Sequence, residues 1–125
     1  MSDGPGETLT GSDDPYVELV LRCAERVPRG RATTYGAIAE AVGEALGRGG
    51  PRTVGSVMSR HGATVPWWRV VRADGSLPDF KDDTARQAYL EEGTPLRRSG
   101  AVDLARAFWR PTLTAADRRI ADGPS

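Results

Sequence analysis

The chain carries few side chains that could act as nucleophiles or metal ligands. It has one cysteine, Cys23, and one histidine, His61, so no internal disulfide can form and the clustered ligands of a zinc site are missing. Cys23 falls on or beside the apolar stripe of a predicted helix, where we expect it to be a small buried hydrophobic residue. His61 follows the predicted helix that Pro51 opens and is expected to cap its C-terminus. These residues predict no Cys–His nucleophile pair, no metal and no cofactor.

Charge is unevenly placed, although the formal net charge is zero. Between Arg26 and Arg72 the only acids are Glu40 and Glu44. The arginines of the same stretch are Arg26, Arg29, Arg31, Arg48, Arg52, Arg60, Arg69 and Arg72. A local basic face within a neutral protein favours binding of a shaped polyanion such as DNA.

Three helices are expected to carry this basic stretch. Asp14-Pro15 starts the first, Thr34 can cap the second with Gly43 as its stop, and Pro51 opens the third. Their apolar stripes are Val17, Val20, Leu21 and Ala24, then Tyr35, Ile38, Ala39 and Val42, then Val54, Val57 and Met58. The third helix carries Arg52, Ser56, Ser59 and Arg60 on its other face. A turn joining the last two helices makes them a helix-turn-helix candidate.

The remainder of the chain predicts a small β element and one more helix. Residues 65–71 are rich in β-formers, and Asp74-Gly75 is a strong turn signal, so we expect a short hairpin or wing. Asp83 can cap a helix that ends at Gly93, and residues 101–110 can add an edge strand or short helix. The predicted fold is mainly α with a small β-hairpin or wing. Its domain spans residues 14–110, between flexible tails at 1–13 and 111–125.

Composition limits the classes of protein to consider. With 125 residues, 38% of them hydrophobic and 27% charged, the chain suits one small globular domain. No apolar run is long enough for a membrane span, and the first residues lack the pattern of a secretory signal. We therefore expect a cytoplasmic protein with no membrane partner.

Three segments in register resemble one known family. They are Thr33-Thr34-Tyr35-Gly36-Ala37-Ile38-Ala39, Pro51-Arg52-Thr53-Val54-Gly55 and Pro66-Trp67-Trp68-Arg69-Val70-Val71. In order and spacing they are similar to the DNA-binding domain of the O6-alkylguanine-DNA alkyltransferases, over about residues 14–96. The resemblance implies a winged helix-turn-helix alkyltransferase domain.

The resemblance also implies a site. Arg52 would enter the stack vacated by a flipped nucleotide, and Tyr35 would press on the phosphate at the lesion. Small residues on the DNA side, Gly55, Ser56 and Ser59, would let a helix enter the minor groove, and Thr34 would add a phosphate contact. The implied lesion pocket is formed by Tyr35, Trp67, Trp68, Arg69 and Val70.

Trp67 decides what chemistry the resemblance allows. In the active alkyltransferases its position holds the cysteine that accepts the alkyl group, and indole offers no comparable nucleophile. Tryptophan there is the pattern of the alkyltransferase-like proteins, although Trp68 departs from the histidine that they usually keep. The resemblance implies no catalytic residue, and a monomeric sensor that binds double-stranded DNA containing O6-alkylguanine and passes it to nucleotide excision repair proteins.

Two alternatives from other classes remain open on the sequence. A winged helix-turn-helix transcription regulator would need base-reading side chains such as Asn or Gln on its recognition helix, and the helix after Pro51 has neither. An enzyme using Cys23 as a displaced nucleophile would need that thiol exposed near Trp67. Helical periodicity places Cys23 at the packed face instead.

Overall fold

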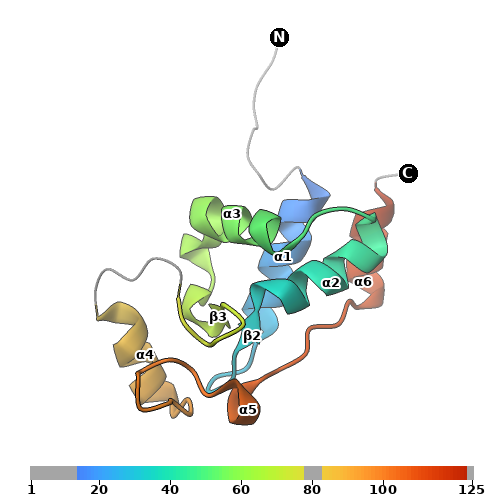
Figure 1. Cartoon of the computed structure of the whole chain (residues 1–125). Coiled ribbons are helices and arrows are strands. Elements are labelled where there is room, and N and C mark those ends of the chain that lie inside the picture. Colours follow the sequence, from blue (N-terminus) through green and yellow to red (C-terminus); the bar gives the residue numbers. More distant parts are fainter. Residues whose placement is uncertain (1–13, 78–82, 124–125) are drawn as a thin grey trace.

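The computed structural model describes residues 14–77 and 83–123, which form a mainly helical domain (Figure 1). Its helices are α1 (Pro15–Arg26), α2 (Tyr35–Leu46), α3 (Pro51–His61), α4 (Thr84–Glu92), α5 (Leu104–Ala107) and α6 (Ala115–Asp122). Two 3-10 turns, η2 (Gly62–Thr64) and η3 (Trp67–Arg69), and two strands, β2 (Thr33–Thr34) and β3 (Val70–Val71), complete it. The predicted fold class is confirmed.

The first helices begin where the capping residues place them. The Asp14 carboxylate accepts a hydrogen bond from the backbone N–H of Tyr16 at 2.9 Å, and the Thr34 hydroxyl accepts one from that of Ala37 at 3.0 Å. Each bond satisfies one of the N–H groups that a helix start leaves without an intrahelical partner. The C-terminal end of α2 differs from the prediction, because the helix continues past Gly43 and stops at Gly47, whose φ is 69°.

The β element is a parallel pair rather than the predicted hairpin. Strand β3 pairs with β2 in the register Thr33 to Val70 and Thr34 to Val71. The residues before β3 do not extend the strand, because Trp67–Arg69 forms a 3-10 turn. The predicted Asp74-Gly75 turn is present, closed by a 2.8 Å bond from the Gly75 N–H to the Arg72 carbonyl. None of the described residues beyond that turn pairs with β3.

Two hydrophobic clusters hold the elements together, and Trp67 packs against both. The first cluster joins α1, α2 and α3 through residues such as Leu19, Ile38 and Val54, all fully buried. The second joins β3, α4 and the 102–107 segment through Val71, Ala85, Tyr89, Val102 and Ala107. The loop that carries the two tryptophans therefore lies at the seam between the clusters.

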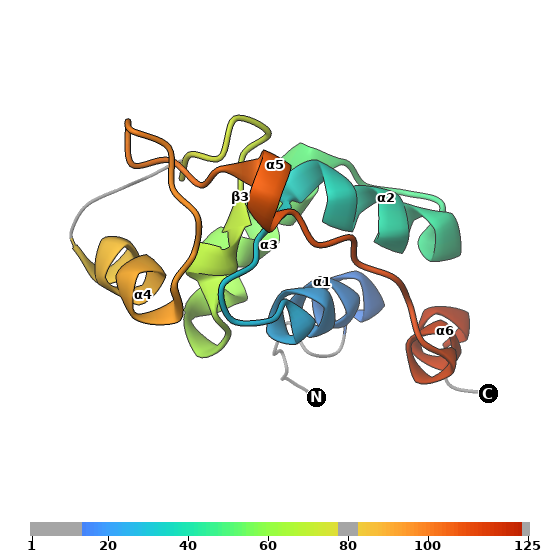
Figure 2. The same cartoon turned by 90° about the horizontal axis from the view of Figure 1, so that it is seen from below.

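The prediction of a flexible tail at residues 111–125 is wrong for the described part of that segment, which contains the packed helix α6. Helix α6 lies against α1 and α2 (Figure 2). Its Asp117 side chain is fully buried. The carboxylate forms ion pairs with Arg22 Nε at 2.7 Å and with Arg26 Nη2 at 2.6 Å. Thr114 and Asp117 also form a reciprocal capping box. The sequence prediction missed the helix because its stabilising contacts join residues far apart in the chain.

Candidate nucleic-acid interface

The solvent-facing side of α3 is small and basic. Arg52, Ser56, Ser59 and Arg60 are exposed, while Val54, Val57 and Met58 pack into the core. A Cβ built on Gly55 would meet nothing within 4 Å, so the helix surface is open there. No acidic residue occurs in α3, and neither arginine has an ion-pair partner within the described ranges. We call Arg52, Gly55, Ser56, Ser59 and Arg60 the α3 face.

The N-termini of α2 and α3 lie next to each other. A Cβ built on Gly36, the second residue of α2, would stand 3.9 Å from Cγ of Pro51, the first residue of α3. Tyr35 and Arg52 therefore leave neighbouring helix starts. Free backbone N–H groups and the helix dipole make such starts favourable for anions, including phosphates. The structure brings the sequence-predicted Thr34, Tyr35 and Arg52 into one region.

A glycine-rich loop fixes the start of α3. Gly47 and Gly49 both have positive φ, at 69° and 89°. A Cβ on Gly49 would collide with the ring of Tyr16, which is itself 1% exposed. Arg48 lies over the same ring, with its guanidinium carbon 5.2 Å from the centroid. Close packing of the loop on Tyr16 thus sets where Pro51 and Arg52 begin the helix.

The two tryptophans of the third motif point to different surroundings. Their rings meet edge to face, with centroids 5.5 Å apart and planes at 81°. Trp67 is half-buried between the two clusters. Trp68 packs only on the second cluster, and its Nε1 donates to Glu92 Oε2 at 3.2 Å. Of the pair, Trp67 is the one that the fold places at the seam, and Trp68 buttresses it.

Arg69 is bonded by protein acceptors through all three guanidinium nitrogens. Nε and Nη2 donate to the two carboxylate oxygens of Glu92 at 3.1 and 2.7 Å, and Nη1 donates to the Val27 carbonyl at 2.8 Å. The Glu92 side chain is 4% exposed. Burial alone would raise its pKa, but the hydrogen bonds from Arg69 and Trp68 outweigh burial and lower the pKa. The bidentate pair locks the motif to α4.

Two residues predicted to line the lesion pocket have a different place. Val70 is fully buried and pairs with Thr33 in the sheet, and each guanidinium nitrogen of Arg69 already donates to a protein acceptor. Val70 is therefore corrected from direct contact to support of the Trp67 segment, and Arg69 bonds the protein around that segment. Glu92 was missed from the sequence, where it is one of two adjacent glutamates before a helix-ending glycine, and nothing in that pattern distinguishes the buried one.

Two tyrosines near the tryptophan loop, Tyr35 and Tyr89, have raised pKa values. Burial raises the pKa of Tyr35, and Arg72 opposes that rise. Burial also raises the pKa of Tyr89, and both Tyr35 and Glu92 add to the rise. The Tyr89 hydroxyl donates to the Trp68 carbonyl at 2.6 Å. A second residue that the sequence did not single out, Tyr89, therefore fixes the backbone next to Trp67 and stays protonated at neutral pH.

Cys23 and His61 lie in the core and at a helix end. Cys23 is fully buried in the first cluster, and burial raises the pKa of its thiol to about 11. His61 is the last, half-buried residue of α3. Within residues 14–77 and 83–123, no group of three His, Cys, Asp or Glu side chains is placed to hold a metal ion. In the same ranges, each helix falls short of the length and apolar character that crossing a bilayer requires.

Similarity to known proteins extends over most of the chain. Residues 15–93 match the family model described as 6-O-methylguanine DNA methyltransferase, DNA binding domain. A DNA base-flipping protein of Escherichia coli K12 is 35% identical over 111 residues, which cover 84% of this chain and 82% of that protein. A DNA base-flipping protein of Vibrio parahaemolyticus is 28% identical, covering 78% of this chain and 99% of that one.

Two solved structures share the fold. S. pombe Atl1, crystallised with damaged DNA containing O6-carboxymethylguanine, superposes with a TM-score of 0.61 at 26% identity. A second structure, of S. pombe ATL with DNA, gives a TM-score of 0.62 at the same identity. Each comparison covers 78% of this chain and 97% of the other.

Proposed function

The chain belongs to the family of the 6-O-methylguanine DNA methyltransferase DNA-binding domain, and from that membership we propose that it recognises DNA carrying O6-alkylguanine by flipping the damaged nucleotide. The base-flipping relatives and the Atl1 complex with O6-carboxymethylguanine support this proposal. The observation that carries it is the α3 face, a small and basic helix surface without acids, next to the start of α2.

Binding begins with phosphate contacts in this proposal. Arginines on the α3 face neutralise phosphates, and the paired starts of α2 and α3 offer N–H groups and the Thr34 region to the backbone. The glycine and serines of the α3 face leave room for the helix in the minor groove. Such contacts set register without reading sequence, as a lesion sensor requires. The same face has no Asn or Gln, which argues against a transcription regulator that reads bases.

Flipping exposes the lesion to the protein. Unstacking a nucleotide costs a few kcal/mol, which its replacement in the stack must offset. Arg52 has a planar guanidinium, no ion-pair partner among the described residues and a place beside Tyr35, so it is the side chain that we assign to the vacated stack. In this proposal Tyr35, at the start of α2, presses on the phosphate at the lesion. Trp67 forms a wall for the extruded base, a contact worth about 1–3 kcal/mol per base.

We also propose that no alkyl transfer follows binding. Trp67 stands at the position of the alkyl-accepting cysteine, and its indole is not a nucleophile toward a saturated carbon. Cys23 cannot substitute, because its thiol is fully buried and its raised pKa, about 11, keeps it protonated. The protein then acts as a monomeric marker of the lesion in the cytoplasm, and the complex passes to nucleotide excision repair proteins.

Base flipping can be tested with a fluorescent stacking probe. A duplex carries O6-methylguanine with 2-aminopurine as its neighbour, and fluorescence rises when the probe loses its stacking partner. We expect a rise on adding the protein, a much smaller one with Arg52→Ala at saturating protein, and an unchanged rise with Arg118→Ala, an exposed arginine on α6. Equal fluorescence from the free and fully bound duplex contradicts flipping.

A further inference from the structure

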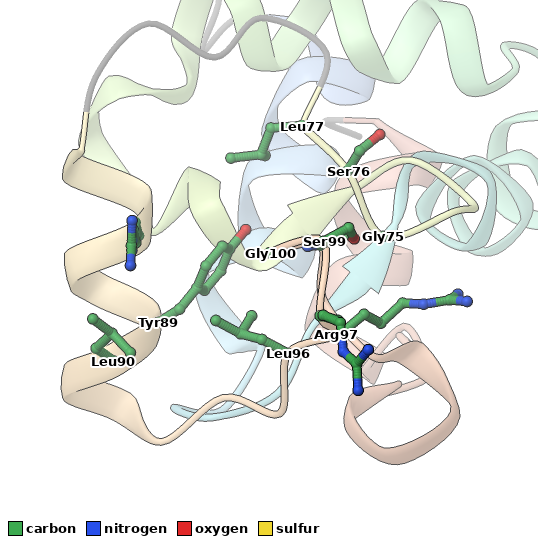
Figure 3. Close-up of a pocket in the computed structure, with 12 residues that line it drawn as sticks. Gly75, Ser76, Leu77, Tyr89, Leu90, Leu96, Arg97, Ser99 and Gly100 are labelled. Carbon is green, nitrogen blue, oxygen red and sulfur yellow. Dashed lines mark hydrogen bonds between the residues drawn. The ribbon is translucent and has the colours of Figure 1, made fainter.

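A concave surface lies away from the α3 face. It is a cavity of about 640 Å³ between α4, the turn before Leu77 and the turn that follows Leu96 (Figure 3). In Figure 1 these elements lie on the other side of β3 from α3. Its volume falls within the range of small ligand sites and of pockets that receive side chains of a partner. None of the residues assigned above to DNA or lesion contact lines it.

The floor and one wall of the cavity are apolar. Leu77, Tyr89, Leu90 and Leu96 line it. Leu90 is 64% exposed, which is unusual among the described large hydrophobic residues. Figure 3 shows Leu90 and Tyr89 on the α4 side and Leu96 opposite them. An exposed apolar patch with a polar rim is typical of protein interaction sites.

The described part of the rim is basic. Arg86, Arg97 and Arg98 line the cavity, and none of them has an ion-pair partner among the described residues. No acidic residue is among the described lining residues of this cavity. Asp74 borders the adjoining hollow with Arg97 and Arg98; its Oδ1 accepts from the backbone N–H and hydroxyl of Ser76 at 2.9 and 2.6 Å, and among the described residues it forms no ion pair with either arginine. The rim is therefore complementary to carboxylates.

The basic turn is held in place before any partner arrives. Gly100, with φ of 96°, donates to the Arg97 carbonyl at 2.9 Å, and the Arg97 N–H donates to the Ala101 carbonyl at 2.7 Å. Leu96 and Val102 form an antiparallel bridge, and the Val102 N–H donates to the Gly75 carbonyl at 2.9 Å. A preformed backbone lowers the ordering cost of binding.

We propose that this cavity docks an acidic segment of a partner protein, with one large apolar side chain seated between Leu90 and Leu96 and carboxylates on the flanking arginines. Arginine–carboxylate pairs can be bidentate and directional, and an apolar anchor in a pocket supplies much of the energy at such interfaces. Phosphates would match the arginines as well, but they leave the exposed leucine and the apolar walls unused. A peptide uses both halves of the surface.

The test uses a defined peptide. A fluorescein-labelled peptide with one phenylalanine flanked on both sides by aspartate and glutamate is titrated with the full chain and followed by anisotropy. We expect saturable binding that weakens about tenfold or more in the double variant Arg97→Glu with Arg98→Glu. Leu90→Ser, at an exposed position that folding tolerates, should weaken it several-fold. The matched control is the double variant Arg118→Glu with Arg119→Glu, at two adjacent exposed arginines on α6. It should leave peptide binding unchanged.

Two peptide controls and one DNA titration complete the design. Replacing the phenylalanine by serine, or the acids by their amides, should each reduce binding. Non-saturable binding, or equal binding to wild type and to the Arg97/Arg98 double variant, overturns the proposal. Loss of affinity for undamaged duplex in that double variant, with no specific peptide binding, would assign the surface to nucleic acid instead. Lesion binding by the α3 face is measured separately with Arg52→Ala, so either proposal can fail alone.

Discussion

The carboxylate of Glu92 binds the guanidinium of Arg69 by accepting two parallel hydrogen bonds, from Nε to Oε1 at 3.1 Å and from Nη2 to Oε2 at 2.7 Å. The pair joins the end of α4 to the turn that carries Trp67, and both side chains are largely buried. Glu92 also accepts from Trp68, so one carboxylate positions two of the three residues after Pro66. The turn that carries Trp67 is thus held by a residue more than twenty positions away.

Loss of this carboxylate should destabilise the fold. Glu92→Ala leaves the Arg69 charge buried without its partner, and we expect the free energy of unfolding to fall by about 3 kcal/mol. Urea denaturation measures the change. Glu91→Ala, its exposed neighbour on α4, is the matched control and should change stability by less than about 0.5 kcal/mol. Equal midpoints for the two variants would mean that the ion pair does not hold the tryptophan loop.

In the glycine loop before α3, alanine should destabilise the fold at one position and be tolerated at the next. Gly49→Ala combines positive φ with a collision against the Tyr16 ring, so we expect a loss of about 2 kcal/mol and weaker DNA binding, because Arg52 is displaced. Gly50→Ala is the control, since Gly50 has an extended backbone and open space around its Cα. Thermal unfolding and duplex titration of both variants check this, and similar behaviour of the two would contradict it.

The buried Asp117 of α6 should make the free energy of unfolding depend on pH in the acid range. Burial alone would raise the pKa of Asp117, but hydrogen bonds from Thr114, Arg26 and Arg22 hold it at about 2, below the usual aspartate value. A depressed pKa contributes stability that is present above the unfolded-state pKa and is lost as pH falls, here between about pH 4 and pH 2. The contribution is about 2 kcal/mol. Asp117→Asn should flatten this part of the stability profile.

The control for that experiment lies on the same helix. Asp122 is exposed near the end of α6, and Asp122→Asn should keep the wild-type loss of stability over the same pH range. If wild type and Asp117→Asn lost stability in parallel as the pH was lowered, the buried ion pairs would not be what fastens α6 to α1.

The Cys23 thiol should resist modification in the folded protein. It is fully buried, and its pKa, about 11, leaves almost no thiolate at neutral pH. An aromatic disulfide reagent, whose released thiolate absorbs light, should therefore hardly react with the native protein. It should react once guanidinium chloride unfolds the chain. Rapid reaction of the native protein would return Cys23 to the candidate nucleophiles.

Local signals predicted most of the fold. The Asp14 and Thr34 caps, Pro51 and the apolar stripes placed α1, α2 and α3, because those features act within a helical turn. The long-range contacts were beyond such signals. The parallel pairing of Thr33 with Val70, and the burial of Asp117 by arginines about 90 positions earlier, depend on how distant segments meet.

The candidate site shows the same difference between local signals and long-range contacts. Tyr35, Arg52, Ser56 and Ser59 were predicted from motif positions, and the structure exposes the α3 face and puts the two helix starts side by side. The neighbours of Trp67 were harder to assign. Whether Arg69 faces a ligand or a protein carboxylate depends on Glu92, which arrives from α4 and has no pattern linking it to the motif.

The most direct test of the central claim is an anisotropy titration of matched duplexes with guanine or O6-methylguanine at one position, followed by mass spectrometry of the protein. We predict tighter binding to the alkylated duplex, affinity that falls with salt as counterions are released, and an unchanged protein mass. Equal affinity for both duplexes would contradict lesion recognition, and a mass gain of one methyl group would contradict a sensor that leaves the adduct on the DNA.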